Sequence, residues 1–312
     1  MEKVIFDTNA YRYLASGRYW DQIDLLIDKI KKKERKNGIE TLMSSVVAME
    51  LLAHVASKKD KQYQKCLNAI KAMYLHNGNK VNFQMVANLE LQIAKSFFNK
   101  SFLKKIETSQ AIGQILFHLA THPTDYVFRK FQRNLNLIKN HVFESEQAFI
   151  SGMKSFIKTT DPTAKNWRIF ENNPVNRTNV LNYIRSQQAS IEIAYGWIYA
   201  VYLHLVANGE ISLNQKFDFY NMSLKFIETF PEPIILQKQV LENMVNSEFD
   251  LTQNNRSNFL WDIQLMIHAG VNKLSGDRLY LVTSDDAMMQ AAKKCGHHFS
   301  IYTFEEYMDI LK

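Results

Sequence analysis

The placement of strand-like segments is the sequence feature that most constrains the fold. Short, mostly apolar runs occur near the two ends of the chain, at residues 3–6 (KVIF), 40–43 (ETLM), 279–283 (LYLVT) and 299–302 (FSIY). A helical pattern follows each run, and this alternation favours an α/β fold with a parallel sheet. Between about residues 58 and 240 we find only runs with helical periodicity.

These two patterns predict two domains. Residues 1–57 and 241–312, together 129 residues, form a discontinuous α/β domain of ordinary size. Residues 58–240 form an all-helical insertion within it.

Capping residues predict where several helices begin and end. The helix expected over residues 20–36 ends where Gly38 supplies a left-handed cap. A second helix is expected over residues 258–271. Thr303 and Glu306 form a capping box that opens the last helix.

The composition excludes several classes of protein. With 10 glycines and 5 prolines the chain is too poor in turn residues for an all-β sandwich or barrel. Two cysteines, Cys66 and Cys295, can form neither a disulfide framework nor a structural zinc site. No signal-peptide core precedes Asp7, so we expect a cytoplasmic protein with reduced thiols.

The most apolar long segment is residues 191–207 (IEIAYGWIYAVYLHLVA). It contains Glu192 and His204 and is shorter than the ~20 residues that a membrane-spanning helix needs. We therefore expect a buried helix of a helical bundle, with no membrane partner.

Positive charge is concentrated in the middle of the chain. Residues 58–240 contain 23 basic and 13 acidic residues, a net charge of +10, whereas the whole chain carries +7. Such an excess is typical of a surface that binds a polyanion, and Arg129, Lys130 and Arg133 are candidates for nucleic-acid binding. Scattered lysines that only solvate helix faces would give the same count.

Four carboxylates are the candidates for catalysis. Asp7 and Asp285 follow two of the strand-like runs, at the carboxyl ends where ligands of open α/β sheets bind. Glu50 and Asp262 lie within apolar helical segments, where an unpaired carboxylate is unfavourable unless it binds a metal or a partner. The alternatives are helix capping by Asp7 and Asp285, and solvent exposure of Glu50 and Asp262.

An all-oxygen set of this kind suits Mg²⁺ or Mn²⁺, which prefer carboxylate ligands and bind phosphate oxygens. We therefore predict that Asp7, Glu50, Asp262 and Asp285 are both the metal ligands and the catalytic residues.

The segments VIFDTNAYRYL, SSVVAMELLAH, FLWDIQLMIHA and LYLVTSDDAMM, in this order, resemble the four acidic motifs of the PIN-domain nucleases. The resemblance covers roughly the 129 residues of the predicted α/β domain and departs from the family in its long helical insertion. It implies a three-layer α/β/α fold with a parallel sheet. In the motifs, Asn9 matches a residue that orients Asp7 or its loop, and Thr283 matches the threonine that orients the metal-site loop. The adjacent Asp286 is expected near the first turn of the next helix, as a capping residue or as a support for a metal-bound water.

The resemblance also implies an activity. A PIN-type endoribonuclease hydrolyses phosphodiester bonds with one or two divalent ions and leaves 5′-phosphate and 3′-hydroxyl ends. The partner would be nucleic acid, RNA rather than DNA. An inhibitory protein or a second copy of the chain could be a further partner of such an enzyme. A toxin, an RNA-processing enzyme and a defence nuclease would share the same site.

Two other functions stay open from the sequence. A haloacid-dehalogenase-like phosphatase also places an Asp after its first strand, but Asn9 cannot supply the general acid that such an enzyme needs two residues later. A non-catalytic PIN-like scaffold would bind RNA or protein through the helical insertion. Turnover of a small phosphate ester would identify the phosphatase. Metal-independent RNA binding without cleavage would identify the scaffold.

Overall fold

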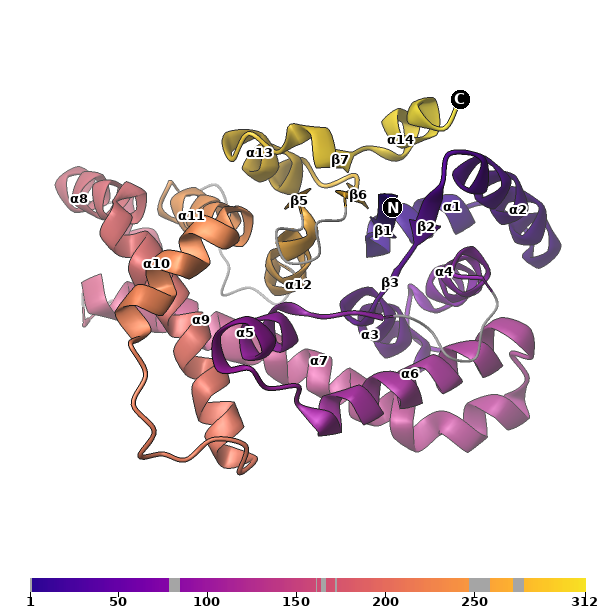
Figure 1. Ribbon diagram of the computed structural model, residues 1–312, viewed down its shortest axis with the longest axis horizontal. Coiled ribbons are helices and arrows are strands. Elements are labelled where there is room, and N and C mark those ends of the chain that lie inside the picture. The colour runs from indigo at the N-terminus through magenta and orange to yellow at the C-terminus, as the bar shows by residue number, and fades with distance from the viewer. Residues whose placement is uncertain are drawn as a thin grey trace. The chain divides into compact units, whose positions relative to one another are not determined.

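A computed structural model of the chain describes residues 2–78, 85–160, 162–163, 167–171, 173–246, 259–271 and 278–312. In these residues the protein is mostly helical and contains a small, mainly parallel sheet, which confirms the predicted α/β character (Figure 1). The chain divides into two compact units. The sheet unit comprises Met1–Asn88, Leu103–Phe143 and His268–Lys312, and the helical unit comprises Leu89–Phe102 and Glu144–Ile267.

The main sheet lies in the sheet unit. Its strands are β1 (Glu2–Phe6), β2 (Ile39–Thr41), β5 (Gly270–Val271), β6 (Arg278–Val282) and β7 (Ile301–Tyr302). β1 lies between β2 and β6 and is parallel to both, and β7 pairs in parallel with the other edge of β6. β5 pairs with β6 in antiparallel orientation. A separate parallel pairing joins β3 (Met43–Ser44) to β4 (Met85–Val86).

The pairing of β1 with β6 sets the position of the candidate site. Val4, Ile5 and Phe6 are fully buried, as expected for a strand whose two faces are both covered. The register pairs Phe6 with Val282, so Asp7 and Thr283 follow side by side at the carboxyl edge of the sheet.

Seven helices and one long shared helix accompany the described strands of the sheet unit. The seven are α1 (Thr8–Ala15), α2 (Trp20–Lys36), α3 (Ser45–Val55), α4 (Tyr63–His76), α6 (Leu103–Thr121), α13 (Asp286–Lys294) and α14 (Phe304–Ile310). The shared helix is α7 (Asp125–Thr160), which begins in the sheet unit and ends in the helical unit. α4 packs against α1, α2, α3 and α6, so it is an integral part of this unit.

Several predicted elements are observed, but two predicted strands are wrong in extent. The strand expected over residues 40–43 is divided into β2 and β3, and the strand expected over residues 299–302 is a 3-10 helix, His298–Ser300, followed by β7. α2 spans Trp20–Lys36, Gly38 adopts a φ of +67°, and Thr303 and Glu306 form the predicted capping box. The helix predicted over residues 258–271 is wrong at its end. α12 (Phe259–Leu265) gives way to a short 3-10 helix, Met266–His268, and then to β5, because residues 270–271 pair with β6.

A buried polar network links several elements of the sheet unit. Glu34 accepts hydrogen bonds from His76 Nε2 (2.8 Å), Tyr307 Oη (2.8 Å) and Thr41 Oγ1 (3.1 Å), and it is only 1% exposed. His76 Nδ1 lies 3.2 Å from Tyr11 Oη. The network therefore connects α1, α2, α4 and α14 through one ionisable cluster.

The helical unit is a bundle. Its helices are α5 (Leu89–Phe98), α8 (Pro174–Arg185), α9 (Gln187–Ala207), α10 (Phe219–Thr229), α11 (Pro231–Val245), α12 and the second part of α7. A 3-10 helix, Trp167–Phe170, also belongs to it. α9 contacts α5, α8, α10 and α11, and its buried residues recur at helical spacing.

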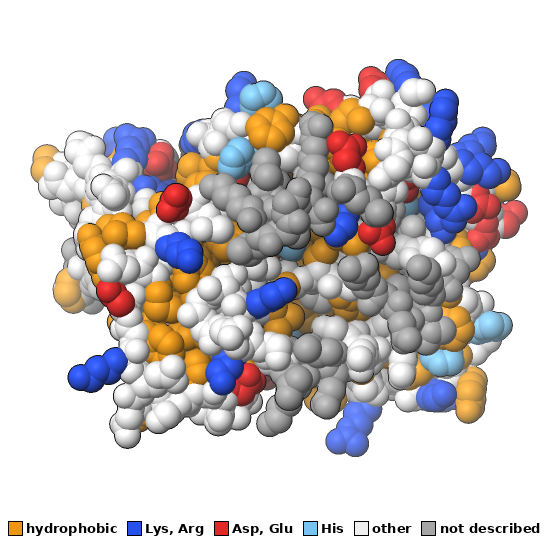
Figure 2. Space-filling view, viewed as in Figure 1, with side chains coloured by type: hydrophobic (Ala, Val, Ile, Leu, Met, Phe, Trp, Pro, Cys, Tyr) orange, Lys and Arg blue, Asp and Glu red, His pale blue; other side chains and the backbone are white. Residues whose placement is uncertain are grey.

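α9 is buried on one face only. Among the described residues it is the one helix long and apolar enough to cross a membrane by length and composition, and 33% of its apolar window is buried. The prediction of a buried bundle helix therefore holds for the face that carries Ala194, Ile198 and Leu205. The other face exposes Tyr195 and Tyr199, and Figure 2 shows hydrophobic side chains gathered over the α9–α10 region.

The unit boundaries differ from those predicted at residues 57/58 and 240/241. α4, α6 and the first part of α7 pack with the sheet unit, whereas Asp262 belongs to the helical unit. The charge is divided accordingly. The sheet unit contains 26 basic and 17 acidic residues (+9), and the helical unit contains 12 and 14 (−2). The positive charge assigned to a helical insertion thus belongs with the sheet, and Figure 2 shows part of it at the α2 end of the sheet unit.

Candidate active site

Asp7 is held at the end of β1 by three hydrogen bonds. Its backbone N–H donates to the carbonyl of Val282 (2.9 Å), which extends the β1–β6 pairing by one residue. Its carboxylate accepts from Ala10 N (2.5 Å at Oδ1) and from Thr283 Oγ1 (2.5 Å at Oδ2). Asp7 is therefore the N-cap of α1 and is only 2% exposed.

Thr283 connects the two strand-end carboxylates, Asp7 and Asp285. Its hydroxyl donates to Asp7 and accepts from the backbone N–H of Asp285 (3.0 Å). The side chain is fully buried. One hydroxyl thus fixes the position of Asp7 relative to the loop that carries Asp285.

Asp285, rather than Asp286, caps α13. Asp285 Oδ1 accepts from Met288 N (2.9 Å), and Asp285 is half-buried. Asp286 is the first residue of the helix and is exposed. The assignment of the capping role to Asp286 is therefore wrong, because the residue that directly precedes a helix is the one whose side chain reaches the N–H groups of its first turn.

Glu50 lies on α3, in contact with α1. Its Oε2 accepts from Thr8 Oγ1 (2.6 Å), and its Oε1 lies 3.9 Å from Arg12 Nη1. The side chain of Glu50 is 16% exposed. Since Thr8 follows Asp7 directly, these contacts hold Glu50 beside the end of β1.

Thr8 and Arg12 are site residues that the sequence analysis missed. They lie one turn apart on α1, a spacing that places both on the same helix face. That spacing after Asp7 was visible in the sequence, but the partner, Glu50, is 42 residues from Thr8. Two guanidinium nitrogens of Arg12, Nε and Nη2, are buried without a hydrogen-bond partner.

The charge of Asp7 is disfavoured in this environment. Burial raises the pKa of Asp7 to about 7, although the hydrogen bonds from Thr283 and Ala10 lower it, and the negative charges of Glu50 and Asp285 raise it further. The carboxylates of Glu50 and Asp285 are thus each close enough to Asp7 for their charges to act on it. A bound cation would relieve that repulsion.

Asp262 and Asn9 complete the predicted set. Asp262 is half-buried on α12 in the helical unit, so it is not among the carboxylates that the sheet unit brings together. Asn9 is exposed in the first turn of α1. The contacts that orient Asp7 come from Thr283 and Ala10 in place of Asn9.

Within the described ranges, no three His, Cys, Asp or Glu side chains gather closely enough to hold a metal ion. Asp7, Glu50 and Asp285 each accept a hydrogen bond from a hydroxyl or backbone N–H group. The available donors are carboxylate and hydroxyl oxygens, and Glu50 and Asp285 each disfavour the charge of Asp7. In donor chemistry these residues fit Mg²⁺ or Mn²⁺.

The predicted nucleic-acid-binding residues lie on the first part of α7. Arg129, Lys130 and Arg133 are exposed there, within the sheet unit. The segment after α3 packs against the same helix, since Gln132 Nε2 donates to the carbonyl of Ala56 (2.9 Å) and Lys58 pairs with Asp125 (2.6 Å). This segment also contains the exposed lysines Lys59 and Lys61, so basic side chains are exposed both here and at the start of α7.

No family model, no curated protein and no solved structure matches this chain.

Proposed function

We propose that the sheet unit is a metal-dependent nuclease of the PIN type, which hydrolyses phosphodiester bonds in RNA. The arrangement of Asp7 and Asp285 carries the proposal. The two residues follow adjacent parallel strands, and the Thr283 hydroxyl links them. The negative charges of Asp285 and of Glu50 both raise the pKa of Asp7. The small, mainly parallel sheet is compatible with an α/β fold.

In this proposal each side chain has a distinct task. Asp7, Glu50 and Asp285, all of the sheet unit, would hold the ion. When bound, a divalent ion would neutralise the scissile phosphate and lower the pKa of an attacking water. Thr283 keeps Asp7 in position, and Thr8 holds Glu50.

The substrate class follows from charge. The sheet unit has a net charge of +9, and Arg129, Lys130 and Arg133 are exposed on α7 within it. α7 packs against the segment that follows α3, and α3 is the helix that carries Glu50. A polyanion is attracted to such a surface by release of its counterions. The preference for RNA over DNA comes from the resemblance to PIN domains.

The test is incubation of the full chain with total RNA, single-stranded DNA and plasmid DNA, each with Mn²⁺ or with chelator. We expect RNA cleavage only with Mn²⁺, and cut ends that carry 5′-phosphate and 3′-hydroxyl groups. A small phosphate ester in parallel should stay intact. Turnover of that ester, or RNA binding that is equal with and without metal and leaves the RNA whole, would contradict the proposal.

A further inference from the structure

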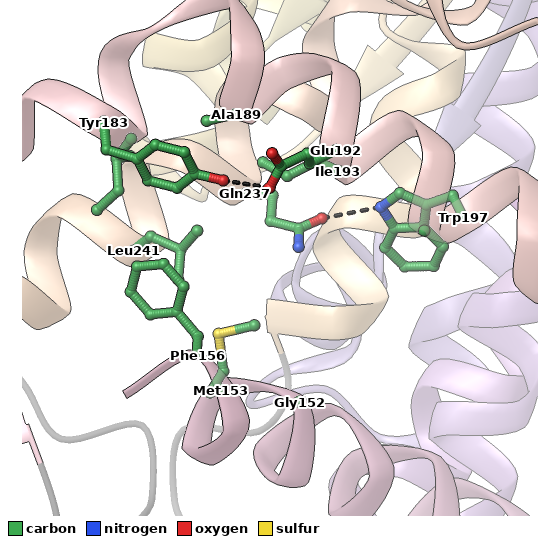
Figure 3. A pocket seen from close by; sticks show the side chains of 12 residues that line it. Gly152, Met153, Phe156, Tyr183, Ala189, Glu192, Ile193, Trp197, Gln237 and Leu241 are labelled. Carbon is green, nitrogen blue, oxygen red and sulfur yellow. Dashed lines mark hydrogen bonds between the residues drawn. The ribbon is translucent and has the colours of Figure 1, made fainter. Parts of the chain in front are cut away.

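The helical unit contains a pocket that the proposed nuclease chemistry does not use. It lies between the second part of α7, α8, α9 and α11 and has a volume of about 340 Å³ (Figure 3). Ligand pockets commonly measure about 300–1,000 Å³, so this one suits a compact ligand.

Most of the pocket wall is apolar and aromatic. Met153, Phe156, Trp197 and Leu241 contribute to it. Three rings, from Phe156, Trp197 and Tyr183, line the same space (Figure 3). A flat ring can bury its faces against such side chains.

Two glycines leave the pocket open. Gly152 on α7 and Gly196 on α9 line it, and a Cβ atom at either position would meet nothing within 4 Å. Glycine inside a helix is unfavourable relative to other residues, and no steric crowding at these positions requires it. The absence of a side chain at the two glycines leaves additional space in the pocket.

Gln237 supplies a hydrogen-bond donor. Its Oε1 accepts from Trp197 Nε1 (2.8 Å), which fixes the orientation of the amide. Figure 3 shows the amide nitrogen pointing away from Trp197. An N–H group in this position selects a ligand with a carbonyl or another acceptor.

Glu192 supplies the complementary acceptor. Its carboxylate accepts from the hydroxyl of Tyr183 and from Gln188 Nε2 (2.8 Å). These two hydrogen bonds lower the pKa of Glu192, so the group is ionised at neutral pH. Each carboxylate oxygen can accept a further hydrogen bond, which favours a ligand with N–H donors.

We propose that this pocket binds a planar heteroaromatic ligand whose edge presents a carbonyl next to N–H donors, as guanine does. Gln237 would donate to the carbonyl, and Glu192 would accept from the N–H groups. In the same orientation adenine would present its amino group to Gln237 and its ring nitrogen to Glu192. Turned over, adenine could pair with both groups, but it would offer Glu192 one N–H donor where guanine offers two. A cationic ring would suit Glu192 but would face the amide N–H of Gln237.

Such an edge can come from a free nucleoside or from a base within an RNA strand. The experiment therefore uses guanosine, adenosine, benzamidine and a short single-stranded oligo-guanosine RNA with the full chain. Binding is measured by calorimetry and by tryptophan fluorescence, since Trp197 lines the pocket. A response to guanosine identifies a small-molecule site, whereas a response to the RNA alone identifies a base-recognition site on a strand.

Two substitutions locate the binding. Glu192→Gln should weaken guanosine binding by about tenfold or more, because a site built around an ionised acceptor loses its partner for the N–H groups. Gly196→Leu should abolish binding by filling the pocket, and its melting temperature should hold or rise because leucine favours a helix more than glycine.

Matched controls are Glu171→Gln, an exposed carboxylate outside the pocket, and Ala200→Leu, one turn from Gly196 on α9. Both should bind like wild type. Guanosine or oligo-guanosine binding that exceeds adenosine binding and is lost in the two pocket variants supports the proposal. Absence of binding, equal binding of guanosine and adenosine, preference for benzamidine, or wild-type binding by Gly196→Leu would overturn it.

Discussion

Asp7 is deeply buried, and the negative charges of Glu50 and Asp285 disfavour the ionised form of its carboxyl group. Its pKa, about 7 in the folded chain against 3.8 ordinarily, means that the folded state binds a proton more tightly than the unfolded state. Without metal, its contribution to stability is therefore largest at low pH and decreases as the pH rises from about 4 to 7. Each pKa unit of this difference corresponds to about 1.4 kcal/mol.

Asp7→Asn should abolish that pH dependence. In chelator, the variant should gain stability relative to wild type as the pH increases from 4 to 8, by up to a few kcal/mol. Melting temperatures of the two proteins across this range measure the effect. A difference that does not change with pH would show that the environment of Asp7 does not disfavour its charge.

Asp285 should have two separable roles, a cap and a charge. Asp285→Ala should cost about 0.5–2 kcal/mol because it removes the N-cap of α13, whereas Asp285→Asn keeps a capping oxygen. Both should lose activity. Asp286→Ala should retain activity and lose less stability, and a tenfold change in its Mn²⁺ requirement would contradict this division.

The strand-end residues of the site could be predicted from sequence, but their contacts could not. An apolar run followed by Asp identifies Asp7, and the threonine two residues before Asp285 was expected to orient the loop. Thr8 and Arg12 were missed because their importance depends on α3, which packs beside α1 only in the folded chain. Asn9 was overestimated because a motif position does not reveal which side of a short helix a residue faces.

Among the elements, α1, α2, α4 and α14 are joined by the network around Glu34. Burial would raise the pKa of Glu34, but the ion pair with His76 and the hydrogen bonds from His76, Tyr307 and Thr41 lower it overall. The stability that Glu34 contributes is therefore present above its ordinary pKa of 4.5 and is lost as the pH falls below it.

Glu34→Gln should cost about 3 kcal/mol at pH 7, because removal of one partner leaves the buried pair broken. Its loss of stability on acidification should be smaller than that of wild type. Denaturant unfolding between pH 3 and 7 measures both effects. Glu40→Gln, on the exposed side of β2, serves as control and should match wild type. An equally steep acid loss in Glu34→Gln would refute the assignment.

Long periodic segments were predicted well, whereas two-residue strands were not. α2 was predicted with the observed bounds because an apolar stripe and a terminal glycine define it. β4 and β5 have two residues each. β4 pairs with β3, and β5 pairs with β6. No local periodicity can identify a strand of that length, since the partner strand supplies its hydrogen bonds.

For the whole molecule, the division of the chain into units was the least predictable property. Helical periodicity shows that α4 and α6 are helices, but it does not show that they pack with the sheet-bearing residues. The basic excess therefore belongs to the same unit as Asp7.

Nucleic-acid affinity should therefore depend on the sheet unit. Reversal of Arg129, Lys130 and Arg133 to Glu should weaken RNA binding and reduce its salt dependence, because fewer counterions are released. Reversal of Lys154, Lys158 and Lys225, which are exposed in the helical unit, should have a smaller effect. Binding isotherms at several salt concentrations compare the two triple variants. Equal losses would contradict a binding surface on the sheet unit.

In the proposed nuclease, the Asp7 carboxylate holds a divalent ion for phosphodiester hydrolysis. Single-turnover cleavage of an end-labelled RNA with Mn²⁺ tests it most directly, with wild type, Asp7→Asn and the exposed control Asp286→Asn side by side. We predict that Asp7→Asn lowers the rate by at least about a hundredfold, as expected for loss of a metal ligand, and that Asp286→Asn retains the wild-type rate. Cleavage by Asp7→Asn at the wild-type rate, or cleavage by wild type in chelator, would contradict the claim.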